Sequence, residues 1–186
     1  MLVRKAVILV KHYSNKKNNM KKVKKIIAAS LFALFTLAAS AQQFSKADQA
    51  IVANYSITIE KVNQYMQFQK SVDAEQVAES KHASLNPPRT LDEAINQTAS
   101  SPSFVKLIKS CGSTPRDMEL THRTLRNLFD ANDPNPKKRV AFKMGCDRGF
   151  TQMPSAEQMA FAKAHSAEMI KWQNQLNVYW KAELAH

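Results

Sequence analysis

The residues with the clearest chemical potential are a carboxylate and an imidazole three positions apart, Glu119 and His122. In a helix this spacing puts both side chains on one face, and helical di-iron bundles use glutamate and histidine at the same spacing. A second pair, His165 and Glu168, has the reverse order. A complete site needs two pairs in the same order and two further inward glutamates, whereas Glu60 is expected on a polar helix face. Chance pairing therefore explains the pattern better than a metal site.

Haem binding is a related alternative. His165 falls near the apolar stripe of the last predicted helix, where it could bind haem together with Met66 or Met118. A histidine on an apolar face is more often a hydrogen-bonded core residue, and methionine more often fills gaps in a core. The chain also lacks the CxxCH sequence for covalent haem attachment. We expect no cofactor, and haem or metal binding through Glu119, His122 and His165 remains the alternative.

Sequence patterns of hydrolytic enzymes are absent. The chain contains neither a GxSxG nucleophile elbow nor an HExxH zinc helix. Serine, histidine and aspartate can be picked from any chain of this size, so their presence does not indicate a catalytic triad. We therefore expect a protein that is not an enzyme, although the sequence leaves an unmarked catalytic cleft open.

An apolar run at residues 26–41 determines which part of the chain we treat as the folded protein. Lysines precede the run and Ala39-Ser40-Ala41 ends it, which together are the features of a secretory signal peptide. A membrane-spanning helix needs about twenty apolar residues, more than this run provides. The sequence thus predicts cleavage after Ala41 and a periplasmic or secreted product without a membrane span. Met20 begins a conventional leader, so residues 1–19 are interpreted as a mis-assigned upstream extension.

The formal charge of +12 is concentrated in the predicted leader. Nine of the 27 basic residues and none of the 15 acidic residues precede residue 42, which leaves 18 basic and 15 acidic groups, or +3, in residues 42–186. This small charge does not indicate nucleic-acid binding, which requires a clustered basic face. A short basic cluster, Lys137-Lys138-Arg139, is interpreted as a solvated turn, with contact to an acidic partner as the alternative.

Cys111 and Cys146 are the two cysteines of the chain. An even pair in a short exported protein most often forms a disulfide, which here would close a loop of about 36 residues. Such a bond stabilises a protein by roughly 3 to 4 kcal/mol in the chain-entropy description. Because the two cysteines have no CxxC spacing, redox or metal-binding thiols are the less favoured interpretation.

Composition and apolar spacing predict an all-α fold. Residues 42–186 are long enough for one domain, and three glycines among many alanines, glutamines and lysines favour helices over sheets. Helices are expected at about 46–72, 91–98, 102–111, 115–131 and 155–184, which makes a bundle-like domain of four to five helices. The helix at 115–131 would bury Met118, Thr121, Leu125, Leu128 and Phe129. Alternating apolar residues at 140–146 instead suggest an extended strand, with a packed loop or helical turn as equal alternatives.

Crowded aromatic residues near the end of the last predicted helix provide one candidate contact site. Trp180 is about 80° around the helix from Trp172, so both rings cannot face the same core. Trp180 is therefore a candidate anchor for another protein or a second copy of the chain. The function expected from the sequence is an exported, non-catalytic helical protein that binds another envelope or secreted protein, with the cofactor protein described above as the alternative.

Overall fold

The computed structural model describes residues 44–72, 88–149 and 151–181, apart from the side chains of residues 179–181. The regular elements in these ranges are all α-helices, which confirms the all-helical prediction. The described helices number eight, more than the four to five expected. The predicted leader and the alternative start at Met20 lie outside the described residues. The helices are α3 (Lys46–Ala53), α4 (Ile59–Ser71), α6 (Leu91–Ser100), α7 (Pro102–Ser110), α8 (Pro115–Ala131), α9 (Pro136–Asp147), α10 (Ala156–Ala164) and α11 (Ser166–Lys181).

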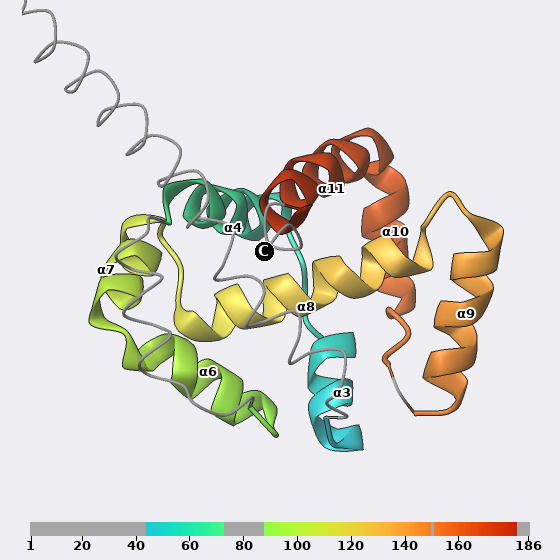
Figure 1. Ribbon diagram of the computed structural model, residues 1–186, viewed down its shortest axis with the longest axis horizontal. Coiled ribbons are helices and arrows are strands. Elements are labelled where there is room, and N and C mark those ends of the chain that lie inside the picture. The colour runs from blue at the N-terminus through green and yellow to red at the C-terminus, as the bar shows by residue number, and fades with distance from the viewer. Residues whose placement is uncertain (1–43, 73–87, 150, 182–186) are drawn as a thin grey trace, which may run out of the picture.

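Helix α8 is the central element of the fold. It crosses the middle of the molecule in Figure 1, with α4 and α11 on one side and α3 and α6 on the other. Thr114 caps its start by accepting a hydrogen bond from the Asp117 amide, and Pro115 occupies the first turn. Helices α3, α4, α6, α7, α9 and α10 pack against it. Most residues of α8 are therefore enclosed by protein, and its polar side chains must find partners inside the fold.

The apolar core lies on both sides of α8. The larger cluster joins α4, α7, α8, α10 and α11, and a smaller one joins α3, α6 and α8. The five α8 residues predicted to be buried are all buried, which confirms that part of the helical pattern. The most deeply buried residues of the larger cluster are Val62, Phe104, Ile108, Leu125, Leu128 and Leu176. The smaller cluster consists of Val52, Leu91 and Leu120.

The prediction of one helix over residues 46–72 is wrong, because the chain breaks between α3 and α4. Asn54 ends α3, and Thr58 begins α4 by accepting a hydrogen bond from the Lys61 amide. Residues 55–58 connect the two helices, and Ile57 within this connection is buried, with 8% exposure. A continuous helix would point this isoleucine elsewhere, so burial of the connecting segment favours two helices over one.

The last predicted helix is also divided into two, α10 and α11. His165 ends α10 with φ −116° and ψ 35°, and its carbonyl accepts the first hydrogen bond of α11 from the Met169 amide. The bend brings Trp172 back over Phe161, with the rings stacked at 6.4 Å between centroids. Met169 and Ala162 belong to the same core cluster.

Residues 136–147 form helix α9 rather than a strand. Asn135 accepts a hydrogen bond from the Lys137 amide, and Pro136 occupies the first turn. Gly149 follows the helix with φ +75°, a left-handed conformation that is common just after a helix end. Of the alternatives that the sequence leaves open for these residues, the helical one is the nearest to the structure and the strand is wrong. The alternation of apolar residues does not reflect burial of one face, because no residue of α9 is buried.

The predicted disulfide is not formed, since Cys111 and Cys146 are both free thiols. Cys111 ends α7 beside the start of α8, whereas Cys146 lies in α9 at the other end of α8 (Figure 1). The 17 residues of α8 separate these ends by about 25 Å, and a disulfide needs α-carbons within about 7 Å. Burial raises the pKa of both thiols. Cys146 Sγ instead lies 2.8 Å from Thr151 Oγ1.

Within the described ranges, every helix is too short or too polar to cross a membrane. The expected absence of a membrane span agrees with this finding for residues 44–72, 88–149 and 151–181.

Candidate functional site

Glu119, the carboxylate of the predicted chemical pair, is buried on α8 with 4% exposure. It forms an ion pair with Arg123 one turn later, whose Nε donates a hydrogen bond to Glu119 Oε1 at 2.7 Å. The guanidinium of Arg123 also covers the ring of Phe44 at 4.0 Å from its centroid. Glu119 therefore orients Arg123, which holds the first described residue of the chain against α8.

His122, the imidazole of the pair, connects α8 to α4. Its Nδ1 lies 2.7 Å from the hydroxyl of Tyr65, and the two groups form a buried hydrogen bond. Burial lowers the pKa of His122 well below the ordinary value of 6.5, and the positive charges of Arg123 and Arg126 lower it further. The imidazole is thus neutral at neutral pH and joins two core helices.

The third candidate ligand, His165, lies at the junction of α10 and α11. Its ring is 4.8 Å from the ring of Phe161, and it is only partly buried. Across the described parts of the chain, no three His, Cys, Asp or Glu side chains are grouped so that they could hold a metal ion. The structure therefore does not bring Glu119, His122 and His165 together as one ligand set.

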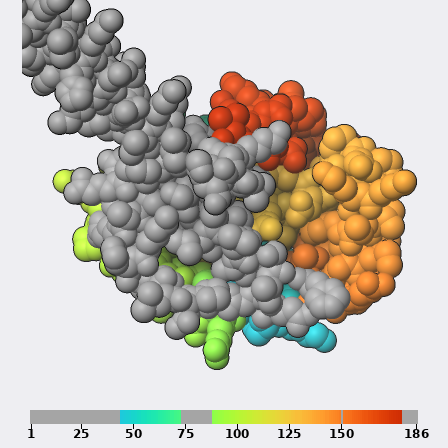
Figure 2. Space-filling view, viewed as in Figure 1, coloured from blue at the N-terminus to red at the C-terminus, as the bar shows by residue number. Residues whose placement is uncertain are grey.

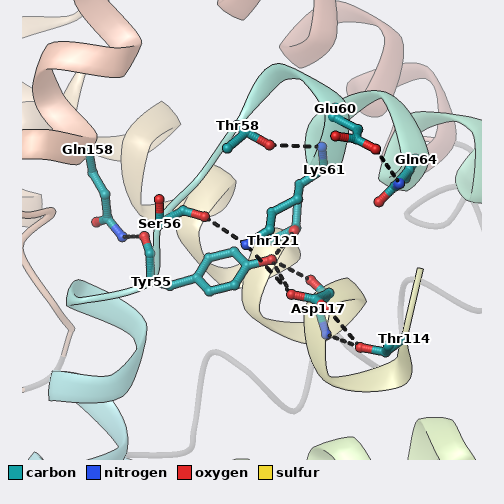
Figure 3. Close-up of polar contacts among 10 residues, drawn as sticks. All are labelled: Tyr55, Ser56, Thr58, Glu60, Lys61, Gln64, Thr114, Asp117, Thr121 and Gln158. Atoms are coloured by element: carbon teal, nitrogen blue, oxygen red, sulfur yellow. Dashed lines mark hydrogen bonds and ion pairs between the residues drawn. The ribbon is translucent and has the colours of Figure 1, made fainter. Parts of the chain in front are cut away.

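A second polar site, the Tyr55 cluster, consists of Tyr55, Lys61, Asp117 and Thr121 (Figure 3). Tyr55 lies in the connection between α3 and α4, and its hydroxyl points to α8. The hydroxyl is 2.9 Å from Asp117 Oδ1 and 3.0 Å from Thr121 Oγ1. Lys61 Nζ lies 4.1 Å from the centre of the Tyr55 ring and 3.7 Å from Asp117 Oδ1. These contacts hold the connection between α3 and α4 against helices α8 and α4.

The electrostatics of the Tyr55 cluster do not suit proton transfer by the phenol. Burial raises the pKa of Tyr55 well above its ordinary value of 10, and Asp117 raises it further by hydrogen bonding and by its charge. The hydrogen bond with Thr121 acts in the opposite direction but is outweighed. Tyr55 therefore keeps its proton at physiological pH and serves as a hydrogen-bond donor, so the cluster acts as a structural joint.

Gln158 fastens the same connection from the α10 side. Its side-chain nitrogen donates to the carbonyls of Val52 and Tyr55, at 2.8 and 3.0 Å, and the residue is 2% exposed. Its side-chain oxygen also accepts from the Ser155 amide, which completes a capping box at the start of α10. One buried glutamine thus couples the break between α3 and α4 to the start of α10.

Helix α9 differs from these sites because it contributes nothing to the core. It packs beside α8 and forms the right-hand edge of the molecule in Figures 1 and 2. Val140 is 58% exposed and Met144 is 45% exposed. These residues are one turn apart, so they lie on the same outward side of the helix. We call the outward side of α9, formed by Lys137, Val140, Lys143, Met144, Asp147 and Arg148, the α9 surface.

The α9 surface carries three cations and one carboxylate, and the whole of α9 is basic. Residues 136–148 contain five lysines and arginines and one aspartate, or +4, which exceeds the +3 carried by residues 42–186 as a whole. Lys138 forms an ion pair with Asp133, and Arg139 donates a hydrogen bond to the Asp133 carbonyl. Among the described residues, Lys137, Lys143 and Arg148 have no ion-pair partner. The α9 surface therefore combines two exposed apolar side chains with three unpaired cations.

The other predicted contact residue, Trp180, belongs to α11, but its side chain lies outside the described residues. The same helix exposes Ile170 at 62% and Val178 at 70%. The exposure of Ile170 contrasts with the inner stripe of α11, where Met169, Trp172 and Leu176 are buried. Helix α11 thus presents single apolar residues to solvent without the concentration of positive charge found on α9.

The sequence indicates only part of the α9 surface. The cluster Lys137-Lys138-Arg139 favours a solvated turn, with contact to an acidic partner as the alternative, and the helix that carries it is not predicted. The useful signal was Asn135-Pro136, because an asparagine cap followed by proline is a helix start of the same kind as Thr114-Pro115. Recognising it would have placed the basic cluster on a helix together with Val140 and Met144.

The chain matches no protein-family model, no curated protein and no solved structure.

Proposed function

We propose that this chain is an exported protein that acts by binding, and that its α9 surface contacts an acidic partner protein. The observation that carries the proposal is the exposure of α9. A helix of 12 residues with no buried side chain stabilises the fold little, yet this one exposes Val140 and Met144 between cations. Apolar patches rimmed by polar side chains are typical of protein contact sites, and Val140 and Met144 form a small patch of this kind.

The other sites support binding over catalysis. In the described structure, the polar groups that could do chemistry are hydrogen-bonded to other side chains. Glu119 bonds to Arg123, His122 to Tyr65, and Tyr55 to Asp117 and Thr121. Each of these groups holds one helix or connection to another. The export part of the proposal rests on the signal-peptide features of residues 20–41.

Site-specific photo-crosslinking in a bacterial host tests the proposal. The crosslinking residue p-benzoylphenylalanine is placed at position 140 on α9, or at position 170 on α11 as a control of similar exposure, 58% against 62%. We expect an adduct from position 140 that disappears in the charge-reversal variant Lys137→Glu/Lys143→Glu and weakens at high salt. The crosslinked peptide of the partner should be rich in Asp and Glu.

The control position distinguishes the two surfaces of the molecule. An adduct from position 170 and none from position 140 would move the binding site to α11 and agree with the prediction for Trp180. No adduct from position 140, or one that is insensitive to charge reversal, would contradict the proposal. Unchanged far-ultraviolet circular dichroism of the charge-reversal variant shows that loss of the adduct is not due to unfolding.

A further inference from the structure

The arrangement of side chains on the α9 surface restricts the shape of the partner. Helix geometry puts Val140 and Met144 about 6 Å apart along the helix, and Asp147 continues the same line one turn later. Lys143 lies on one flank of this line, and Lys137 and Arg148 lie on the other. The surface is thus a ridge of two apolar residues and one carboxylate, with unpaired cations on both sides.

This arrangement fits a protein better than a lipid surface. Two apolar side chains are few for insertion into a bilayer, where interfacial helices carry a continuous apolar face with Trp, Phe or Leu. Asp147, which is exposed and in line with Val140 and Met144, would also face the phosphates of an anionic membrane. In a protein interface the same carboxylate can pair with one basic side chain.

The convex ridge also favours a helix as the contacting element. Side chains on a helix form ridges at i, i+4 spacing, and the grooves between them accept the ridge of a second helix. A partner helix with leucines one turn apart would enclose Val140 and Met144, and glutamates beside the leucines would reach the cations on both flanks. The 12 residues of α9 span about 18 Å, so the contact is small and of the transient class.

We infer that the α9 surface binds one acidic amphipathic helix of the partner. This helix packs against Val140 and Met144, and a single basic residue on it forms an ion pair with Asp147. This inference rests on the proposed function, and it adds the kind of element bound and the direction in which it lies. The lone carboxylate on a basic surface is what fixes that direction, because it is favourable only where a cation faces it.

Three designed helical peptides of 18 residues serve as probes. The first carries leucines at i, i+4, glutamates on both flanks and one lysine a turn beyond the leucines. The second has glutamate in place of this lysine, and the third has lysines in place of all the flanking glutamates. Binding to the protein, covering residues 42–186, is measured by fluorescence anisotropy at low and high salt. Vesicles with about 30% phosphatidylglycerol test the membrane alternative.

We expect the first peptide to bind most tightly and the third not to bind. The double variant Val140→Ser/Met144→Ser should weaken binding of the first peptide about tenfold, because it removes both apolar contacts. Asp147→Lys should reverse the preference between the first two peptides, by about threefold in each direction, as expected for one exposed ion pair.

Equal binding of the three peptides, or no effect of Asp147→Lys on their order, would overturn the inference. Binding to the vesicles in preference to the peptides would replace the protein partner with a membrane. Crosslinking from position 140 to an acidic protein, combined with failure of all three peptides, would retain the proposed function and reject the helical partner. Failure of both experiments would reject both proposals.

Discussion

Two buried threonines on α8 show how strongly the surroundings of a hydroxyl group differ within one helix. Thr121 is 1% exposed and its hydroxyl is hydrogen-bonded to Tyr55. Thr124 is 0% exposed, and its hydroxyl has no hydrogen-bond partner in the described structure. A buried hydroxyl without a partner loses its hydration and gains nothing in return.

Replacing Thr124 by valine should therefore stabilise the protein. Thr124→Val keeps the shape of the side chain and removes the unpaired hydroxyl, so the free energy of unfolding should rise by about 1 kcal/mol. The matched variant Thr121→Val removes a hydroxyl that is paired with Tyr55 and should lower the same quantity by about 1 kcal/mol. Urea denaturation at neutral pH measures both. A Thr124→Val variant that is no more stable than the wild-type protein would contradict the unpaired state of this hydroxyl. A Thr121→Val variant that is not destabilised would contradict the value assigned to the hydrogen bond with Tyr55.

The buried His122 predicts a pH dependence of stability. Its pKa is lowered in the folded protein, so below pH 6.5 the unfolded chain binds a proton that the folded chain does not. The stability contributed by neutral His122 is therefore fully present above the pKa that His122 has in the unfolded chain. It decreases as the pH falls towards the lower pKa that His122 has in the folded protein. The limiting slope for one proton is about 1.4 kcal/mol per pH unit.

We expect His122→Gln to lack this part of the slope between pH 7 and pH 5.5, as measured by urea denaturation of both proteins. Comparison of the two slopes removes the contribution of carboxylates, which titrate in both proteins. If the variant does not fold, the ring resonances of His122 in the wild-type protein supply the test. Their titration near pH 6.5 would contradict the lowered pKa.

At the scale of helices and connections, the sequence predicts several helix starts but not the two places where a predicted helix is interrupted. Thr90, Ser101, Thr114 and Ser155 each cap a helix where the sequence indicated a start. The breaks at residues 54–58 and at His165 follow from the need to return the chain across the core. Thr58 offered a local signal, since it is a capping residue between two isoleucines. His165 offered none, because its neighbours favour helix throughout.

Gln158 tests how strongly a single side chain fixes the connection between α3 and α4. Gln158→Leu would leave the carbonyls of Val52 and Tyr55 without this donor in a buried position, and should lower the free energy of unfolding by roughly 2 kcal/mol. Gln152→Leu is the control, because Gln152 is less buried and donates only to the carbonyl of the next residue, Met153. Thermal or urea unfolding of the two variants gives the comparison. Equal losses of stability in the two variants would mean that the hydrogen bonds of Gln158 do not specifically stabilise this connection.

The two polar partners at the site differ in how far the sequence predicts them. The i, i+3 spacing placed Glu119 and His122 on one helix face, and both are buried. Their partners differ in origin, because Arg123 is one turn away on the same helix whereas Tyr65 is 57 residues distant. The first contact can be inferred from helical spacing, but the second depends on how α4 packs against α8.

At the scale of the whole molecule, the disulfide prediction failed for a similar reason. The number and spacing of cysteines gave a plausible loop, but the length of α8 determines the distance between Cys111 and Cys146. The leader is independent of this packing, so its prediction stands on the sequence alone.

Mass spectrometry of the exported protein tests the leader and the cysteines together. Material produced from its own leader should begin at Gln42, since residues 39–41 form the predicted cleavage site. Iodoacetamide applied to the unfolded protein without prior reduction should alkylate two cysteines in each chain. A mass that includes residues 20–41 would contradict cleavage, and the absence of alkylation would restore the disulfide.

The central position of α8 has a consequence for the order in which the chain acquires structure. Synthesis proceeds from the amino end, so α3, α4, α6 and α7 are complete before residue 131 becomes available. Helix α7 packs against α4 and α6, but each of the two core clusters also includes residues of α8 and is complete only once α8 is present. Helices α3, α4, α6 and α7 therefore reach their final packing only after residues 115–131 have been made.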